Sequence, residues 1–103
     1  MAKLLVLYNP PEDLAAFESH YFGVHVGLAK RFPGVRSYTV SRGPVMKVSG
    51  KPGPFVFIAE LTFDSVDDIR AALAGPEGQA SGADMPNFAG AGYQVLMYES
   101  SEC

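Results

Sequence analysis

The strongest β-strand of the chain is predicted for the stretch Phe55-Val56-Phe57-Ile58-Ala59-Glu60-Leu61-Thr62-Phe63. It is rich in β-branched and aromatic residues, which favour strands. Successive side chains of a strand point to opposite faces, so Phe55, Phe57, Ala59, Leu61 and Phe63 share one face, while Val56 and Ile58 start the other. An antiparallel sheet covered by helices on one side is expected to be polar on the other. This strand is apolar on both, which predicts that both faces of its sheet are covered.

The segments around this strand predict one α+β domain over residues 1–103. The expected order is β-α-β-β-α-β, with strands at residues 3–8, 35–43, 55–63 and 92–99. A long amphipathic helix is expected at about 12–31, a helix from Ser65 to about Ala74, and a short helix at 77–84. Residues 43–54 are expected to form a hairpin connection between the second and third strands. Two right-handed β-α-β halves place the helices on one face of a four-stranded antiparallel sheet.

The last strand repeats the two-faced pattern. Tyr93, Val95 and Met97 fall on one face, and Leu96 and Tyr98 fall on the other. The chain offers no third layer to cover the second face, and large apolar patches are uncommon on monomers. A homodimer that pairs the two sheets about a two-fold axis is therefore expected. The alternative is that the extra apolar residues belong to a curled edge.

Composition and charge exclude several classes of function. The chain is 48% hydrophobic and 18% charged, as in globular proteins, and its net charge is −3 without a cluster of Lys and Arg. Binding to nucleic acid is therefore not expected. The single cysteine, Cys103, cannot form an internal disulfide or a multi-cysteine metal site. The apolar run at residues 4–8 is too short for a signal segment or a membrane span, which predicts a cytoplasmic protein.

Four segments in order along the chain carry a resemblance to the EthD-domain family. They are residues 21–29 (YFGVHVGLA), 32–38 (FPGVRSY), 60–65 (ELTFDS) and 76–80 (PEGQA), the last followed by Asp84 and Asn87-Phe88. The chain departs from the family at Gly27, where a proline is common. The resemblance implies a ferredoxin-like fold and membership of the dimeric α/β-barrel proteins, which pair their sheets face to face. Relatives of this architecture include cyclases, decarboxylases and isomerases that act on aromatic or polyketide substrates, mostly without a cofactor.

His25 is the candidate catalytic residue. It lies at the edge of the buried stripe of the long helix, and its ordinary pKa allows proton transfer near neutral pH. The alternative is a structural histidine bonded to a backbone carbonyl. In a regular α-helix, His20 lies on the opposite edge of the stripe, about 140° from His25. The two are then unable to share a metal ion, and no metal site is expected.

Three tyrosines, Tyr21, Tyr38 and Tyr8, are candidate substrate-binding residues, since a phenol can hydrogen-bond a carbonyl and hold an enolate. The alternative for each is an ordinary core aromatic whose hydroxyl reaches the rim. Glu60 is a further candidate because a carboxylate in an apolar strand needs a partner. The alternative for Glu60 is an ion pair with Arg36 or Arg42.

Asn87 and Phe88 are expected to close the cleft as a lid. Together these residues predict a cofactor-independent enzyme that moves a proton on a small aromatic or polyketide-like carbonyl compound through His25. The competing hypothesis is a non-catalytic module that binds a small apolar or aromatic ligand, or serves a partner enzyme in a degradation or biosynthesis pathway.

Overall fold

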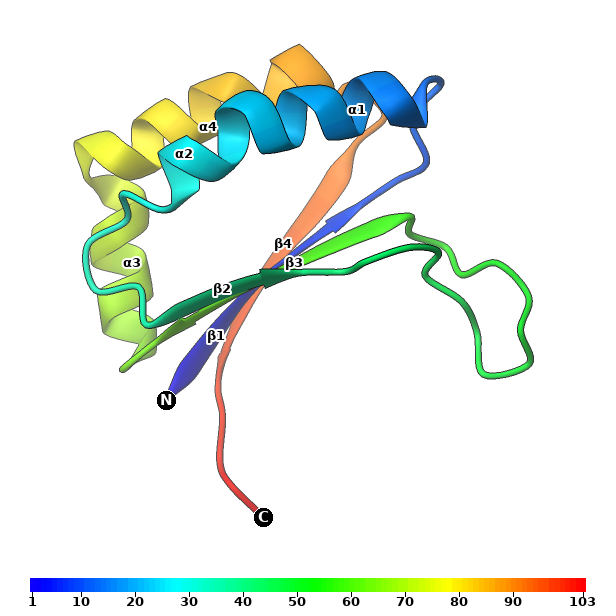
Figure 1. Cartoon of the computed structure of the whole chain (residues 1–103). Helices are drawn as coiled ribbons and strands as arrows, with labels where there is room; N and C mark the ends of the chain where they lie inside the picture. Colours follow the sequence, from blue (N-terminus) through cyan, green and yellow to red (C-terminus); the bar gives the residue numbers. More distant parts are fainter.

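The computed structural model describes residues 1–103 and contains one four-stranded antiparallel sheet with its helices on one face (Figure 1). The strands are β1 (Ala2–Tyr8), β2 (Ser37–Val40), β3 (Phe57–Phe63) and β4 (Tyr93–Glu99), in the order β2-β3-β1-β4. The predicted β-α-β-β-α-β order is confirmed. The second strand is shorter than predicted, and the third begins two residues later.

The register of the sheet decides which side chains meet the helices. Tyr8 in β1 lies opposite Phe57 in β3 and Tyr93 in β4, and Leu4 lies opposite Leu61. Directly opposed residues share a face. Tyr8, Phe57, Leu4 and Leu61 are all buried, so this face packs against the helices and forms the core.

One long helical segment crosses the sheet between β1 and β2. It consists of α1 (Leu14–His20), a π-helical stretch η1 (Tyr21–His25) and α2 (Val26–Ala29). The carboxylate of Asp13 accepts a hydrogen bond from the backbone N–H of Ala16 at 3.0 Å and so caps the first turn. Gly34, at φ 81°, provides the left-handed residue after the helical segment.

Two helices follow β3, namely α3 (Val66–Ala74) and α4 (Pro76–Phe88). The Ser65 hydroxyl accepts from the N–H of Asp68 at 3.1 Å, which confirms the predicted cap. Gly78 is buried at the α3–α4 corner, where a Cβ atom would lie 2.3 Å from the carbonyl oxygen of Leu73. The second helix continues past the predicted end at Asp84 to Phe88, although Pro86 in its last turn removes one backbone hydrogen-bond donor.

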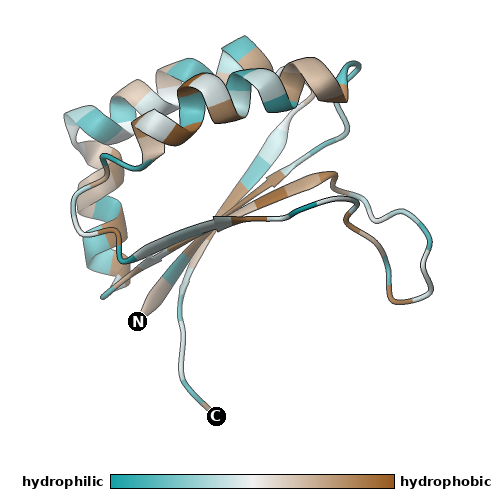
Figure 2. Cartoon of the chain, in the orientation of Figure 1, coloured by the Kyte–Doolittle hydropathy of each residue, from teal (hydrophilic) through white to brown (hydrophobic).

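Aromatic rings fill the core between the helices and the sheet. Tyr8, Phe17, Tyr21, Phe57 and Phe88 pack mostly edge to face, with ring centroids 4.6 to 6.0 Å apart. Figure 2 shows hydrophobic residues along the strands and mixed colouring on the helices, as expected of amphipathic elements. This core holds the helical residues that form the site.

The other face of the sheet carries no helix (Figure 1). Its apolar side chains are Leu5, Leu7, Ile58, Leu96 and Tyr98, of which Leu96 and Tyr98 are 49% and 45% exposed. We call this set the open face. No helix of the chain has the length and apolar character needed to span a membrane.

Candidate functional site

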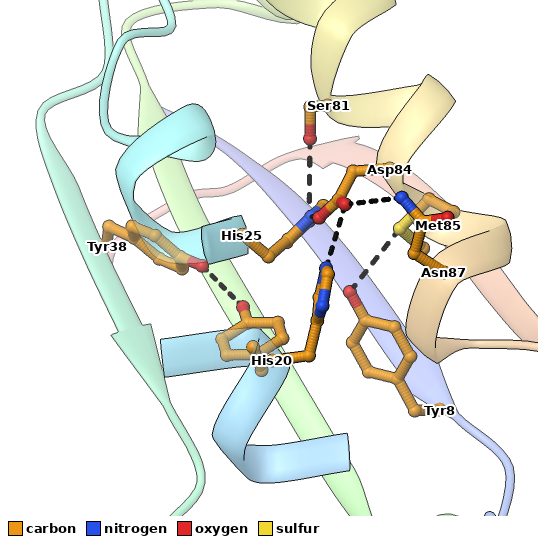
Figure 3. A network of polar contacts seen from close by, with 9 residues as sticks. Tyr8, His20, His25, Tyr38, Ser81, Asp84, Met85 and Asn87 are labelled. Carbon is orange, nitrogen blue, oxygen red and sulfur yellow. Dashed lines mark hydrogen bonds and ion pairs between the residues drawn. The ribbon is translucent and has the colours of Figure 1, made fainter. Parts of the chain in front are cut away.

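The π-helical stretch η1 brings His20 and His25 to the same carboxylate. The N–H of Val26 donates to the carbonyl oxygen of Tyr21, five residues earlier. In such a turn, residues five apart lie one above the other, whereas in an α-helix they diverge. The prediction that His20 and His25 lie on opposite edges is therefore wrong. Both point to Asp84 of α4 (Figure 3).

Asp84 is the centre of a polar cluster inside the protein. Its Oδ1 accepts from His20 Nε2 at 2.8 Å and from Asn87 Nδ2 at 3.0 Å, and its Oδ2 accepts from His25 Nδ1 at 2.9 Å. The residue is only 6% exposed. Burial by itself raises the pKa of Asp84, but the hydrogen bonds from Asn87, His20 and His25 outweigh it, and the pKa is lowered. The carboxylate is therefore ionised and acts only as an acceptor.

The orientation of His25 follows from this contact. Because ionised Asp84 can only accept, the Nδ1 of His25 carries a hydrogen, and in the neutral ring Nε2 is left with its lone pair. The Ser81 hydroxyl is the one protein group near Nε2, at 3.4 Å. Burial lowers the pKa of His25, and Asp84 only partly offsets the effect. The ring is therefore neutral at physiological pH, and the Ser81 hydroxyl is the one partner of the Nε2 lone pair, at the long distance of 3.4 Å.

A cavity of about 130 Å³ lies between the helices and the sheet next to His25. Its walls come from all four strands, the long helical segment, α3 and α4, and most of the lining residues are apolar. His25, Ser81 and the three tyrosines Tyr8, Tyr21 and Tyr38 bring polar groups to it. The cavity thus combines an apolar wall with a few convergent polar groups, as small-molecule sites commonly do.

The tyrosine hydroxyls in this cavity have few partners. Tyr21 and Tyr38 hydrogen-bond each other through their hydroxyl groups, so one of the two hydrogens remains free. Tyr8 donates only to the Met85 thioether, at 3.8 Å, which is a weak acceptor. Burial is the main cause of the raised pKa of Tyr8, Tyr21 and Tyr38. All three are therefore neutral phenols and can act as donors.

The remaining predicted residues lie elsewhere or differ from their expected roles. Glu60 is on the open face, away from this cavity, and pairs with Lys3 at 3.2 Å rather than with an arginine. Asn87 holds Asp84, and Phe88 is buried against the ring of His20 with centroids 5.3 Å apart, so both are fixed parts of α4 and neither lines this cavity. No group of three or more His, Cys, Asp and Glu side chains is arranged to hold a metal ion.

Two features of the site were missed in the sequence. Asp84 drew attention only through the resemblance, although it lies three residues after Ser81 and four before Phe88, which puts a carboxylate on the same helix face as a large aromatic side chain. That pattern is a usable signal for a paired buried charge. The π-helical turn has no comparable signal, because its sequence reads equally well as α-helix.

Comparison with known proteins finds relatives along almost the whole chain. The EthD domain matches residues 9–92. An uncharacterised 11.0 kDa protein in the thcB-thcC intergenic region of Rhodococcus erythropolis is 36% identical over 96 residues, or 93% of this chain and 91% of that protein. The crystal structure of an EthD family protein from Bacillus halodurans is 35% identical with a TM-score of 0.87, and the match covers 98% of this chain and 99% of that one.

More distant structures share the ferredoxin-like fold. A dimeric ferredoxin-like protein of Jannaschia is 19% identical with a TM-score of 0.68, over 96% of this chain and 98% of that one. SnoaB, a cofactor-independent oxygenase of Streptomyces nogalater, is 16% identical with a TM-score of 0.68, over 99% and 94% of the two chains. At these identities the likeness establishes the α+β ferredoxin-like fold alone.

Proposed function

The chain belongs to the EthD domain family, and we propose that it is a cofactor-independent enzyme that moves a proton on a small carbonyl compound. One observation carries the proposal. His25 is buried beside an apolar cavity, with Nδ1 held by Asp84 and Nε2 unoccupied except for the distant Ser81 hydroxyl. This is the arrangement of a general base whose tautomer is fixed by a carboxylate.

In the proposed step, Nε2 of His25 takes a proton from the carbon next to the substrate carbonyl. The C–H electron pair forms the enolate, and the negative charge moves to the carbonyl oxygen. Tyr8 and the free hydroxyl hydrogen of the Tyr21–Tyr38 pair donate to that oxygen. Asp84 stabilises the imidazolium through Nδ1–H. Return of the proton to a different atom of the enolate completes an isomerisation.

The test measures hydrogen–deuterium exchange at the benzylic carbon of phenylacetone in deuterated buffer. We expect the wild-type protein to accelerate exchange, and His25→Asn to lose about 100-fold or more of that acceleration, the usual contribution of a general base. The variant should keep its circular dichroism and thermal unfolding. Equal exchange by wild type and His25→Asn would remove His25 from the role of base.

Asp84→Asn tests the positioning of the base in the same assay. We expect slower exchange together with a change of tautomer at His25. The introduced amide can place its NH₂ group where the carboxylate oxygen Oδ2 accepted from Nδ1–H, and that group donates to Nδ1 and moves the ring hydrogen to Nε2. The ring ¹⁵N chemical shifts of His25 report which nitrogen carries the hydrogen. If Asp84 has a purely structural role, Asp84→Asn will lower the stability of the protein but leave the tautomer of His25 unchanged.

A second candidate function is ligand binding without turnover. Three donors converge on Asp84 and both of its oxygens are hydrogen-bonded, which favours a structural role for the cluster. NMR titration with phenylacetone, together with the exchange assay, separates the two. Binding without turnover changes the His25 signals but gives no exchange above that of His25→Asn, whereas a general base gives both.

We also propose that the protein works as a homodimer through the open face. Leu5, Leu7, Ile58, Leu96 and Tyr98 form an apolar surface that nothing in the chain covers. Fold neighbours described as dimeric ferredoxin-like proteins support this arrangement. The cavity lies on the opposite side of the sheet, so each protomer would carry its own site.

A further inference from the structure

Three exposed residues mark an opening of the cavity. Among all the residues that line it, only Gly82, Tyr93 and Val95 are exposed, and the others are buried or half-buried. Gly82 belongs to α4, and Tyr93 and Val95 belong to β4. No Cα atom of α4 lies within 8 Å of a Cα atom of β4, so only side chains would close the space between the two elements, and the exposure of these three residues shows that they leave it open. The cavity therefore meets solvent between them.

Two glycines line the cavity, Gly78 and Gly82, and packing explains the missing side chain only at Gly78. A Cβ atom at Gly78 would collide with backbone, whereas a Cβ atom at Gly82 would meet nothing within 4 Å. Glycine inside a helix costs about 0.5–1 kcal/mol relative to alanine. Helix packing does not require that cost at Gly82. The missing side chain instead leaves the opening free.

The lining limits the chemical class of ligand. It contains no Lys, Arg, Asp or Glu, so a buried charged ligand would have no ion-pair partner. Its volume of about 130 Å³ is close to that of an engineered cavity of about 150 Å³ that binds benzene. An uncharged molecule with one aromatic ring and a short carbonyl side chain fits these limits, and the Tyr8 hydroxyl and His25 Nε2 offer it one donor and one acceptor.

We propose that this opening between Gly82 and the Tyr93–Val95 edge is where an uncharged single-ring carbonyl compound enters, and that Gly82 sets the size limit. The inference uses the cavity of the proposed function but needs only binding there, not proton transfer.

The experiment measures binding of phenylacetone by ¹³C-methyl NMR, following the methyl groups of Leu4, Leu61 and Val95. Gly82 is replaced stepwise by Ala, Val and Leu. We expect affinity to fall along the series, by at least tenfold at Gly82→Leu, while the melting temperature of Gly82→Ala rises. Gly27→Leu is the matched control, since Gly27 is also an exposed helical glycine with nothing within 4 Å of its Cβ position but does not line the cavity. Its affinity should equal that of wild type.

Two results would overturn the inference. Unchanged affinity in a folded Gly82→Val or Gly82→Leu protein would place the entrance elsewhere. Phenylacetate binding as tightly as phenylacetone would remove the limit to uncharged ligands. Failure of the proposed function looks different, because phenylacetone would then bind with the predicted Gly82 dependence while His25→Asn left its exchange unchanged.

Discussion

At the scale of single residues, the site depends on how one buried carboxylate is shared. Asp84 holds His20, His25 and Asn87 at once, and this fixes the ring of His25 so that Nε2 faces Ser81, which also lines the cavity. An ionised Asp84 inside the protein is stable only with such partners. The same contacts that could prepare His25 for catalysis therefore also hold α4 against the long helical segment.

The titration of these residues predicts loss of stability in acid. Burial lowers the pKa of His25 below its ordinary 6.5, so below that pH the unfolded chain binds a proton that folded His25 does not. The free energy of unfolding must then fall as pH decreases through 6.5. The pKa of Asp84 is lowered too, because its hydrogen bonds outweigh the effect of burial, so the loss continues as pH falls through 3.8.

The measurement is the melting temperature between about pH 7 and pH 5, the range in which histidine titrates. His25→Gln is the control, because it keeps His20, Asp84, Ser81 and Tyr21 around the position but cannot titrate there. We expect a smaller decrease of the melting temperature in His25→Gln than in wild type. Equal decreases would mean that His25 titrates alike in the folded and unfolded states.

At the scale of elements, periodicity and capping predicted most of the fold. The strand at β3, the Ser65 cap and the order of elements all follow from local patterns whose physical causes act within a few residues. The partner of Glu60 could not be predicted in this way, because Lys3 comes from a strand far away in sequence. Among the predicted site residues, His25 and the three tyrosines line one cavity, and their roles stay a proposal. The joining of His20 and His25 at Asp84 depends on a π-helical turn that leaves no trace in the sequence pattern.

The π-helical turn predicts a difference between two single-residue deletions. Deleting Gly23 would turn η1 into α-helix, and His20 and His25 would then be four apart and still aligned. Deleting Gly27 offers no such solution. Either Ala29 and Phe32 rotate by about 100° out of the core, or loss of the π-helical turn rotates His25 away from Asp84. Both glycines are exposed and make no close contact at the Cβ position.

We expect the Gly23 deletion to fold, with a melting temperature near that of wild type and with the His25 ring ¹⁵N signals unchanged. The Gly27 deletion should lose several kcal/mol, as removal of a large core side chain does. Thermal unfolding and the ¹⁵N spectra measure both effects. If the Gly23 deletion is less stable than the Gly27 deletion, the π-helical turn itself stabilises the fold and is not simply the result of one inserted residue.

At the scale of the whole molecule, the two faces of the sheet have different roles. One face packs on the helices and encloses the cavity, and the open face is left apolar. Lys3 and Glu60 pair on that open face, so it carries little net charge that would oppose a second copy. Covering this face would stiffen the floor of the cavity, since the two surfaces belong to the same four strands.

The open face predicts how the protein associates. Fully burying a Leu side chain contributes about 1.5–3 kcal/mol, and a lysine placed in the same contact would add an unpaired buried charge. We therefore expect wild-type protein to sediment at twice 11.0 kDa and Leu96→Lys to sediment as a folded monomer, with dimer affinity at least about 100-fold lower. Val48→Lys, at a fully exposed position in the loop after β2, should remain dimeric. If the wild-type protein sediments as a folded monomer at micromolar concentration, the proposed dimer through the open face is wrong. The proposal for the His25 cavity would be unaffected, because that cavity lies within one chain.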